Sequence, residues 1–112
     1  MNPVAESKIS NVGNPQVKYE SIDVFGGFFR LRKCGNIVIV NIEGSFTAQS
    51  GWHTLNNVLP NEYSSSARYA FNFITVSGVG IYGYVTGKNI EIHIDRNISS
   101  DNGYAGFSYF TV

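Results

Sequence analysis

"IVIVNIEGSF", residues 37–46, alternates between two kinds of side chain with a period of two. One face carries the apolar residues Val38, Val40, Ile42 and Phe46. The other face carries the polar residues Asn41, Glu43 and Ser45. Successive side chains of a β-strand point to opposite faces of the sheet, so the segment predicts a strand with one face in a core and the other face wetter.

The segments before this strand contain the turn residues that are typical of a hairpin. "IDVFGGFFRLRK" (22–33) predicts either a pair of strands or one bulged strand, with Gly26-Gly27 supplying the bend. "CGN" (34–36) predicts a tight turn, because Gly-Asn between β-branched runs is typical of hairpins. Residues 1–21 are polar, contain two prolines and have no sustained period, so we expect a lead-in segment there.

The segments after residue 46 alternate as well, apart from two stretches. Residues 47–68 have no regular period and predict an irregular crossing. Further strands are predicted at 69–78, 79–86, 90–95 and 104–112, with a turn at 87–89 and a loop at 96–103. The strand at 69–78 has apolar residues on both faces, so we expect both faces to be covered. In 90–95 we expect an inward face of Ile90, Ile92 and Ile94 and an outward face of Glu91, His93 and Asp95.

These elements predict one all-β domain at residues 22–112. No window has the i, i+3, i+4, i+7 spacing of an amphipathic helix. Six to eight short strands with turn signals between them predict an antiparallel β-sandwich with jelly-roll-like strand connectivity.

The composition excludes several classes of partner. The net charge is zero and only 14% of the residues are charged, against roughly 25% in a typical domain. We therefore expect no nucleic acid and no membrane insertion, since phosphate contacts need clustered cations and no run reaches the length of a membrane span. A polar but uncharged surface suits neutral hydroxylated ligands and other proteins. The N-terminus has no signal peptide pattern, and a single cysteine, Cys34, allows no intrachain disulfide.

Catalytic chemistry has little support in the sequence. Glu91, His93 and Asp95 share one strand face, where they could bind a metal or transfer protons. The alternative is a solvated outer face, which the all-isoleucine opposite face favours. No nucleophile-elbow motif is present. We expect neither an enzyme nor a bound metal or cofactor.

The aromatic residues are the other candidates for function. Trp52 and several tyrosines have flat apolar faces with polar tips, which suit stacking on a sugar ring. The alternative is that most of them fill the core of a small sandwich. Tyr82 and Tyr84 fall on the same strand face, so at least these two rings stand together.

Four segments carry a resemblance to a known family. They are "RKCGNIVIVNIEGSF", "WHTLNNVLPNEYSSS", "GVGIYGYVTGKNIEIHI" and the terminal "GFSYFTV". In this order they resemble the C-terminal receptor-binding head domains of bacteriophage and prophage tail-fibre and baseplate proteins. The resemblance covers residues 30–112. The chain departs from the family motif after Leu59-Pro60, where Glu62 replaces a glycine and Ser64-Ser65 replace Arg-Pro.

The resemblance implies a non-enzymatic, trimeric β-sandwich head that attaches to a saccharide of the host cell surface. It implies a place in the virion tail, contacts with other tail proteins, and residues 1–21 as the join to a stalk. It also implies that Trp52, Leu55, Val58, Leu59 and Pro60 pack inside the crossing between the sheets. The exposed remainder of this crossing, His53 to Asn57 and Glu62 to Arg68, could then contact a ligand.

Two alternatives stay open beside the receptor-binding head. One is a structural tail component that binds only other tail proteins, and the other is a monomeric carbohydrate-binding or adhesion module of a cellular protein. For a saccharide ligand, the sequence nominates the residues Trp52, His53, Tyr63, Arg68, Tyr82, Tyr84 and Tyr104.

Overall fold

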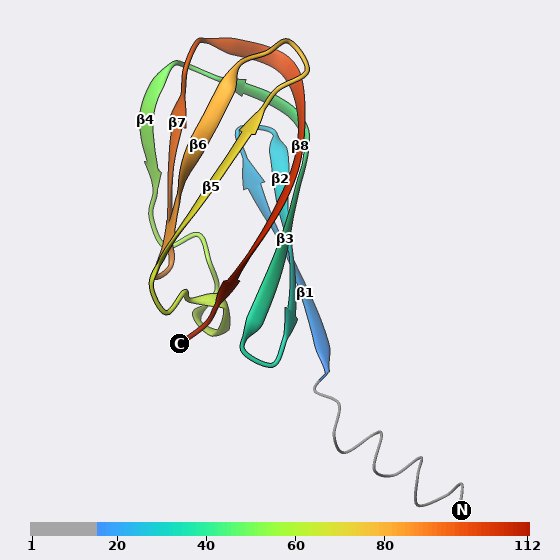
Figure 1. The fold of residues 1–112 in the computed structure, drawn as a ribbon, viewed down its shortest axis with the longest axis vertical. Helices are drawn as coiled ribbons and strands as arrows, with labels where there is room; N and C mark the ends of the chain where they lie inside the picture. The colour runs from blue at the N-terminus through green and yellow to red at the C-terminus, as the bar shows by residue number, and fades with distance from the viewer. Residues whose placement is uncertain (1–15) are drawn as a thin grey trace, which may run out of the picture.

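The computed structural model describes residues 16–112, which form two four-stranded antiparallel sheets packed as a sandwich (Figure 1). Sheet A has the order β1-β2-β3-β8 and comprises β1 (Val17–Val24), β2 (Gly27–Cys34), β3 (Ile37–Ala48) and β8 (Ile98–Phe110). Sheet B has the order β4-β7-β6-β5 and comprises β4 (Gly51–Leu55), β7 (Asn89–Ile94), β6 (Gly80–Thr86) and β5 (Arg68–Ile74). The predicted antiparallel β-sandwich is confirmed, with eight strands.

The core lies between the sheets and is built by the predicted alternation. The four apolar residues of β3 are all buried, namely Val38, Val40, Ile42 and Phe46. The three isoleucines of β7 face them from sheet B and are buried as well: Ile90, Ile92 and Ile94. At roughly 1.5–3 kcal/mol for each fully buried large apolar side chain, these two strands supply a large share of the hydrophobic stabilisation.

Two paired strands pass together from one sheet to the other. β3 pairs with β8 in sheet A, and their continuations β4 and β7 pair in sheet B. The transfer needs a local irregularity, and the register between β3 and β8 shifts between Phe46 and Ala48. These two strand pairs hold the sandwich closed.

The N-terminal hairpin resolves the alternatives at residues 22–33. β1 and β2 form a strand pair whose turn is Phe25-Gly26, with φ values of 54° and 88°. The glycine is suited to this left-handed conformation. β1 begins at Val17, within the segment expected to be a lead-in. The rest of that lead-in, residues 1–15, lies outside the described part of the chain.

Two stretches predicted to be irregular contain strands. β4 occupies Gly51–Leu55, inside the expected crossing, and β8 begins at Ile98, inside the expected loop 96–103. In both cases the hydrogen bonds come from a neighbouring strand that the local residues do not reveal. The expected covering of both faces of 69–78 is wrong for the single chain, because Ile74 is 70% exposed.

The segment after β4 is held by a few buried anchors. Leu59 is buried, and its backbone N–H donates to the Lys88 carbonyl at 3.1 Å. The short 3₁₀ turn η1 (Asn61–Tyr63) buries Tyr63, whose carbonyl accepts a 2.8 Å hydrogen bond from the Tyr109 hydroxyl. Leu55 and Val58 pack against the core from the same segment. Within residues 16–112, no helix is long and apolar enough to cross a bilayer.

We expect Tyr109→Phe to lower the free energy of unfolding by about 1–3 kcal/mol, because it leaves the buried Tyr63 carbonyl without its donor. Burial raises the pKa of Tyr109 above its ordinary value of 10.0. The folded chain therefore keeps this proton at pH values where the unfolded chain releases it, so stability falls as the pH rises above 10. Urea unfolding at neutral and alkaline pH measures both effects. An unchanged midpoint at neutral pH and the same alkaline slope in both proteins would contradict this role.

Candidate functional site

The outer face of sheet B carries four rings that lie together. Trp52 comes from β4, His93 from β7, and Tyr82 and Tyr84 from β6. Trp52 is directly opposite His93 in the β4–β7 pair, and His93 is directly opposite Tyr82 in the β7–β6 pair. Because these residues alternate with the buried ones of each strand, all four side chains project away from the core. We call Trp52, Tyr82, Tyr84 and His93 the aromatic cluster.

The rings of the aromatic cluster fix one another. The Trp52 ring lies parallel to the Tyr84 ring, at 5° and 6.0 Å between centroids. It stands edge-on to Tyr82 at 5.6 Å and to His93 at 5.1 Å. Tyr82 in turn stacks on His93 at 4.7 Å. Such pairs stabilise particular ring orientations, so the surface is preformed.

Large parts of the rings remain accessible. Trp52 is 55% exposed and Tyr82 is 40% exposed. An indole that is half open to solvent on a flat sheet face offers a hydrophobic plane with a polar N–H at its edge. This combination fits a ligand that has one apolar face and a polar rim.

A cation borders the cluster on the β5 side. The Arg68 guanidinium lies over the Tyr84 ring, with Cζ 5.0 Å from its centroid. A cation over an aromatic face is attracted by the ring quadrupole, and at exposed sites this contributes about 0.5–1 kcal/mol. Arg68 therefore helps to hold Tyr84 and places hydrogen-bond donors beside the rings.

The carboxylates on this face do not build a metal site. His93 Nδ1 lies 3.1 Å from Asp95 Oδ1. The Nδ1 atom is nevertheless buried and makes no hydrogen bond of good geometry. In the described part of the chain, no three His, Cys, Asp or Glu side chains lie together as metal ligands. Glu91 and Asp95 are thus polar neighbours of the aromatic cluster.

The expected internal packing of Trp52 is wrong. In β4 it is His53 that faces inward, where its ring meets Phe25 at 5.0 Å and its Nε2 lies 2.7 Å from the Gln49 carbonyl. The alternation of the strand then places Trp52 outward. Leu55, Val58 and Leu59 do pack inward, as expected.

The seven nominated residues fall into three groups. Trp52, Arg68, Tyr82 and Tyr84 lie together on sheet B. His53 packs on the inner face of sheet B, and Tyr63 is buried, with 2% of its surface exposed. Tyr104 is exposed but lies on the outer face of sheet A, opposite Glu43.

The binding prediction missed His93, although its outward position was visible in the isoleucine alternation. Only the register between β7 and its two neighbours brings it against Trp52 and Tyr82. The cluster as a whole offers a stacking surface with mixed polar edges. Comparison with protein-family models gives no match for this chain, and comparison with curated proteins gives none either.

Proposed function

We propose that this chain is the receptor-binding head of a phage tail-fibre or baseplate protein, and that it attaches to a host cell-surface saccharide through the aromatic cluster. The observation that carries the proposal is the exposed, preformed set of rings on sheet B. A pyranose ring presents a patch of C–H groups on one face and hydroxyls around its rim. The Trp52 plane suits the first, and the polar groups of Arg68 and Tyr82 suit the second.

The shape of the surface favours weak binding at each site. The cluster lies on an outer sheet face that leaves much of a sugar in contact with water. Several such sites on one particle give strong attachment, because the second and later contacts form at a high effective concentration. A trimeric head on a tail with many fibres would bind its host through several such sites at once.

The trimer and the jelly-roll-like strand connectivity belong to the same proposal. The connectivity is supported by the two strand pairs that pass together between the sheets. The trimer is supported by a strip of neighbouring exposed residues across one end of sheet A: Val17, Cys34, Ile37 and Phe110. Adjacent exposed apolar side chains of this kind mark contact surfaces.

We expect light scattering on a sizing column to give about three times 12.3 kDa for the chain. Ile37→Glu should shift the mass to that of one chain, because it places a charge in the apolar strip. Ile74→Glu is the matched control, since Ile74 is the same residue type and is more exposed than Ile37, at 70% against 41%, but lies outside the strip. A mass of 12.3 kDa for the unaltered chain would favour the monomeric module, and an unchanged trimer in Ile37→Glu would place the contact elsewhere.

A glycan array probed with the labelled chain tests the saccharide part directly. We expect binding to a restricted group of glycans, followed by measurable affinity for the best one in titration calorimetry. The array should include bacterial cell-wall and capsular saccharides. Absence of binding to every glycan, together with a stable trimer, would favour the structural tail component.

A further inference from the structure

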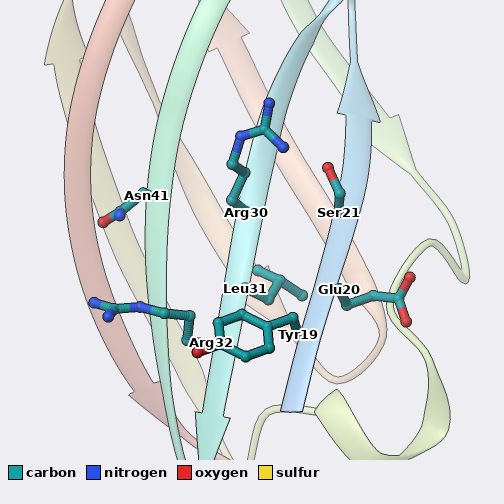
Figure 2. A pocket seen from close by; sticks show the side chains of 7 residues that line it. All are labelled: Tyr19, Glu20, Ser21, Arg30, Leu31, Arg32 and Asn41. Carbon is teal, nitrogen blue, oxygen red and sulfur yellow. The ribbon is translucent and has the colours of Figure 1, made fainter. Parts of the chain in front are cut away.

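A hollow lies on the opposite side of the sandwich from the aromatic cluster, on the outer face of sheet A. It is a groove of about 460 Å³, and Figure 2 shows the side chains that line it. Five of them bear on its chemistry: Tyr19, Ser21, Arg30, Arg32 and Asn41. Its volume lies within the range of roughly 300–1,000 Å³ that is usual for small-molecule sites.

The strand register explains why the face is hollowed here. Ser21, Arg30 and Asn41 are directly opposite one another on β1, β2 and β3 and line the groove, and Gly106 of β8 continues this row beyond Asn41. Gly106 has no side chain, and an added Cβ would find its nearest atom at 3.5 Å. The row on one side holds Tyr19, Arg32, Ile39 and Ser108. The row on the other side holds Asp23, Phe28, Glu43 and Tyr104.

The two arginines differ in their surroundings. Arg30 Nε donates to Glu43, and its guanidinium lies 4.9 Å from the centroid of the Phe28 ring. These contacts orient the guanidinium and use only one of its nitrogens. Arg32 has no ion pair or side-chain hydrogen bond within residues 16–112. Arg32 therefore brings into the groove a positive charge without an ion-pair partner among these residues.

The nearby carboxylate of Glu20 does not neutralise this charge. Glu20 lines the groove, but its side chain points to the other side of β1 from Arg32 (Figure 2). Tyr19 lies directly opposite Arg32 in the β1–β2 pair and is 71% exposed. A flat ring, a free guanidinium, a hydroxyl and an amide thus open into one groove.

We propose that this groove binds an acidic saccharide through an oxyanion, either a carboxylate or a phosphate. Arg32 donates two parallel hydrogen bonds to the oxyanion, a geometry for which guanidinium is suited and ammonium is not. Arg30 contributes its remaining nitrogens. Ser21 and Asn41 bind sugar hydroxyls, and Tyr19 packs against the sugar ring. The site is separate from the aromatic cluster and does not depend on it.

Three sugars of similar size test the proposal: glucuronic acid, glucose 6-phosphate and glucose. Addition of each is followed by NMR of the backbone amides and the arginine Nε–H groups of the whole chain. We expect the charged sugars to shift the signals of Arg32 and Tyr19, and glucose to shift neither. A response to only one charged sugar assigns the oxyanion as carboxylate or phosphate. Equal shifts with glucose would overturn the proposal.

Substitutions separate the groove from general charge effects. Arg32→Gln should weaken binding of the charged sugar about tenfold or more, since it removes a charge-assisted bidentate contact. Arg32→Lys should restore only part of the loss. Ser21→Gln should also weaken binding, because a larger side chain at this lining position fills part of the groove. Arg96 is an exposed arginine outside the groove, so Arg96→Gln should leave the affinity for the charged sugar unchanged. Undiminished binding in Arg32→Gln would contradict the assignment, whether or not the aromatic cluster binds its own glycan.

Discussion

Trp52→Ala is expected to weaken saccharide binding about thirtyfold or more, so that binding falls below detection on an array. Removing the indole takes away the largest exposed plane of the aromatic cluster. It also removes the ring that lies parallel to Tyr84 and edge-on to Tyr82, so each of these tyrosines loses one of the contacts that orient it. Aromatic residues at the centre of a binding surface often contribute 2 kcal/mol or more, which corresponds to this loss.

Two control variants make the Trp52 result specific. Tyr104→Ala removes an equally exposed ring from the outer face of sheet A and should leave this affinity unchanged. Trp52→Phe keeps a smaller plane and should retain part of the binding. The half-exposed Trp52 contributes little to the core, so the melting temperature should change by only a few degrees. Unchanged affinity in Trp52→Ala would remove the aromatic cluster as the binding surface.

Gly83→Ala is expected to destabilise the chain by about 3 kcal/mol or more, which is a large share of the roughly 5–15 kcal/mol that stabilises a typical domain. Gly83 lies in β6 directly opposite Ile92 of β7. A Cβ at this position would lie 1.9 Å from the Glu91 carbonyl oxygen, which belongs to the neighbouring backbone. A strand backbone cannot move aside as a side chain can, so β6 and β7 would have to separate.

The control for Gly83 is another glycine in a strand. Gly106 lies in β8, and an added Cβ there meets its nearest atom at an ordinary 3.5 Å. Gly106→Ala should therefore change the free energy of unfolding by less than about 1 kcal/mol. Urea unfolding followed by circular dichroism measures both variants. If both glycine variants had equal stability, the close approach of β6 and β7 would not be needed for folding.

The strands that could be predicted correctly from the sequence are those with one face buried in the core and one face exposed to solvent. Residues 37–46 and 90–95 alternate because each strand has its own side of the core to fill, and this needs no knowledge of the partner strand. The start of β8 lacks such a signal. Its Ser99, Ser100 and Asp101 are typical turn residues, yet they lie within a strand, because β3 pairs with Ile98 and Asp101 on either side of the irregularity at Ser99 and Ser100.

The candidate site was predicted in part for a related reason. That Tyr82 and Tyr84 share a face follows from their spacing within one strand. The position of Trp52 beside them depends on two strand pairings, β4 with β7 and β7 with β6, which link residues far apart in the chain. Tyr63 could not be separated from the exposed tyrosines, because its burial is set by Tyr109 from the other end of the sequence.

The way β1 joins sheet A determines how the domain responds to mechanical force. β1 begins at one end of the molecule, whereas β4, β6 and β7, which carry the aromatic cluster, lie toward the other end (Figure 1). Tension between Gln16 and a surface held by the cluster pulls β1 along its own axis. The hydrogen bonds to β2 run perpendicular to that axis, so all eight paired positions of the hairpin share the tension at once. Under the proposed function, a particle anchored in this manner would resist being sheared from its host by flowing liquid, because the bonds of the hairpin must rupture together.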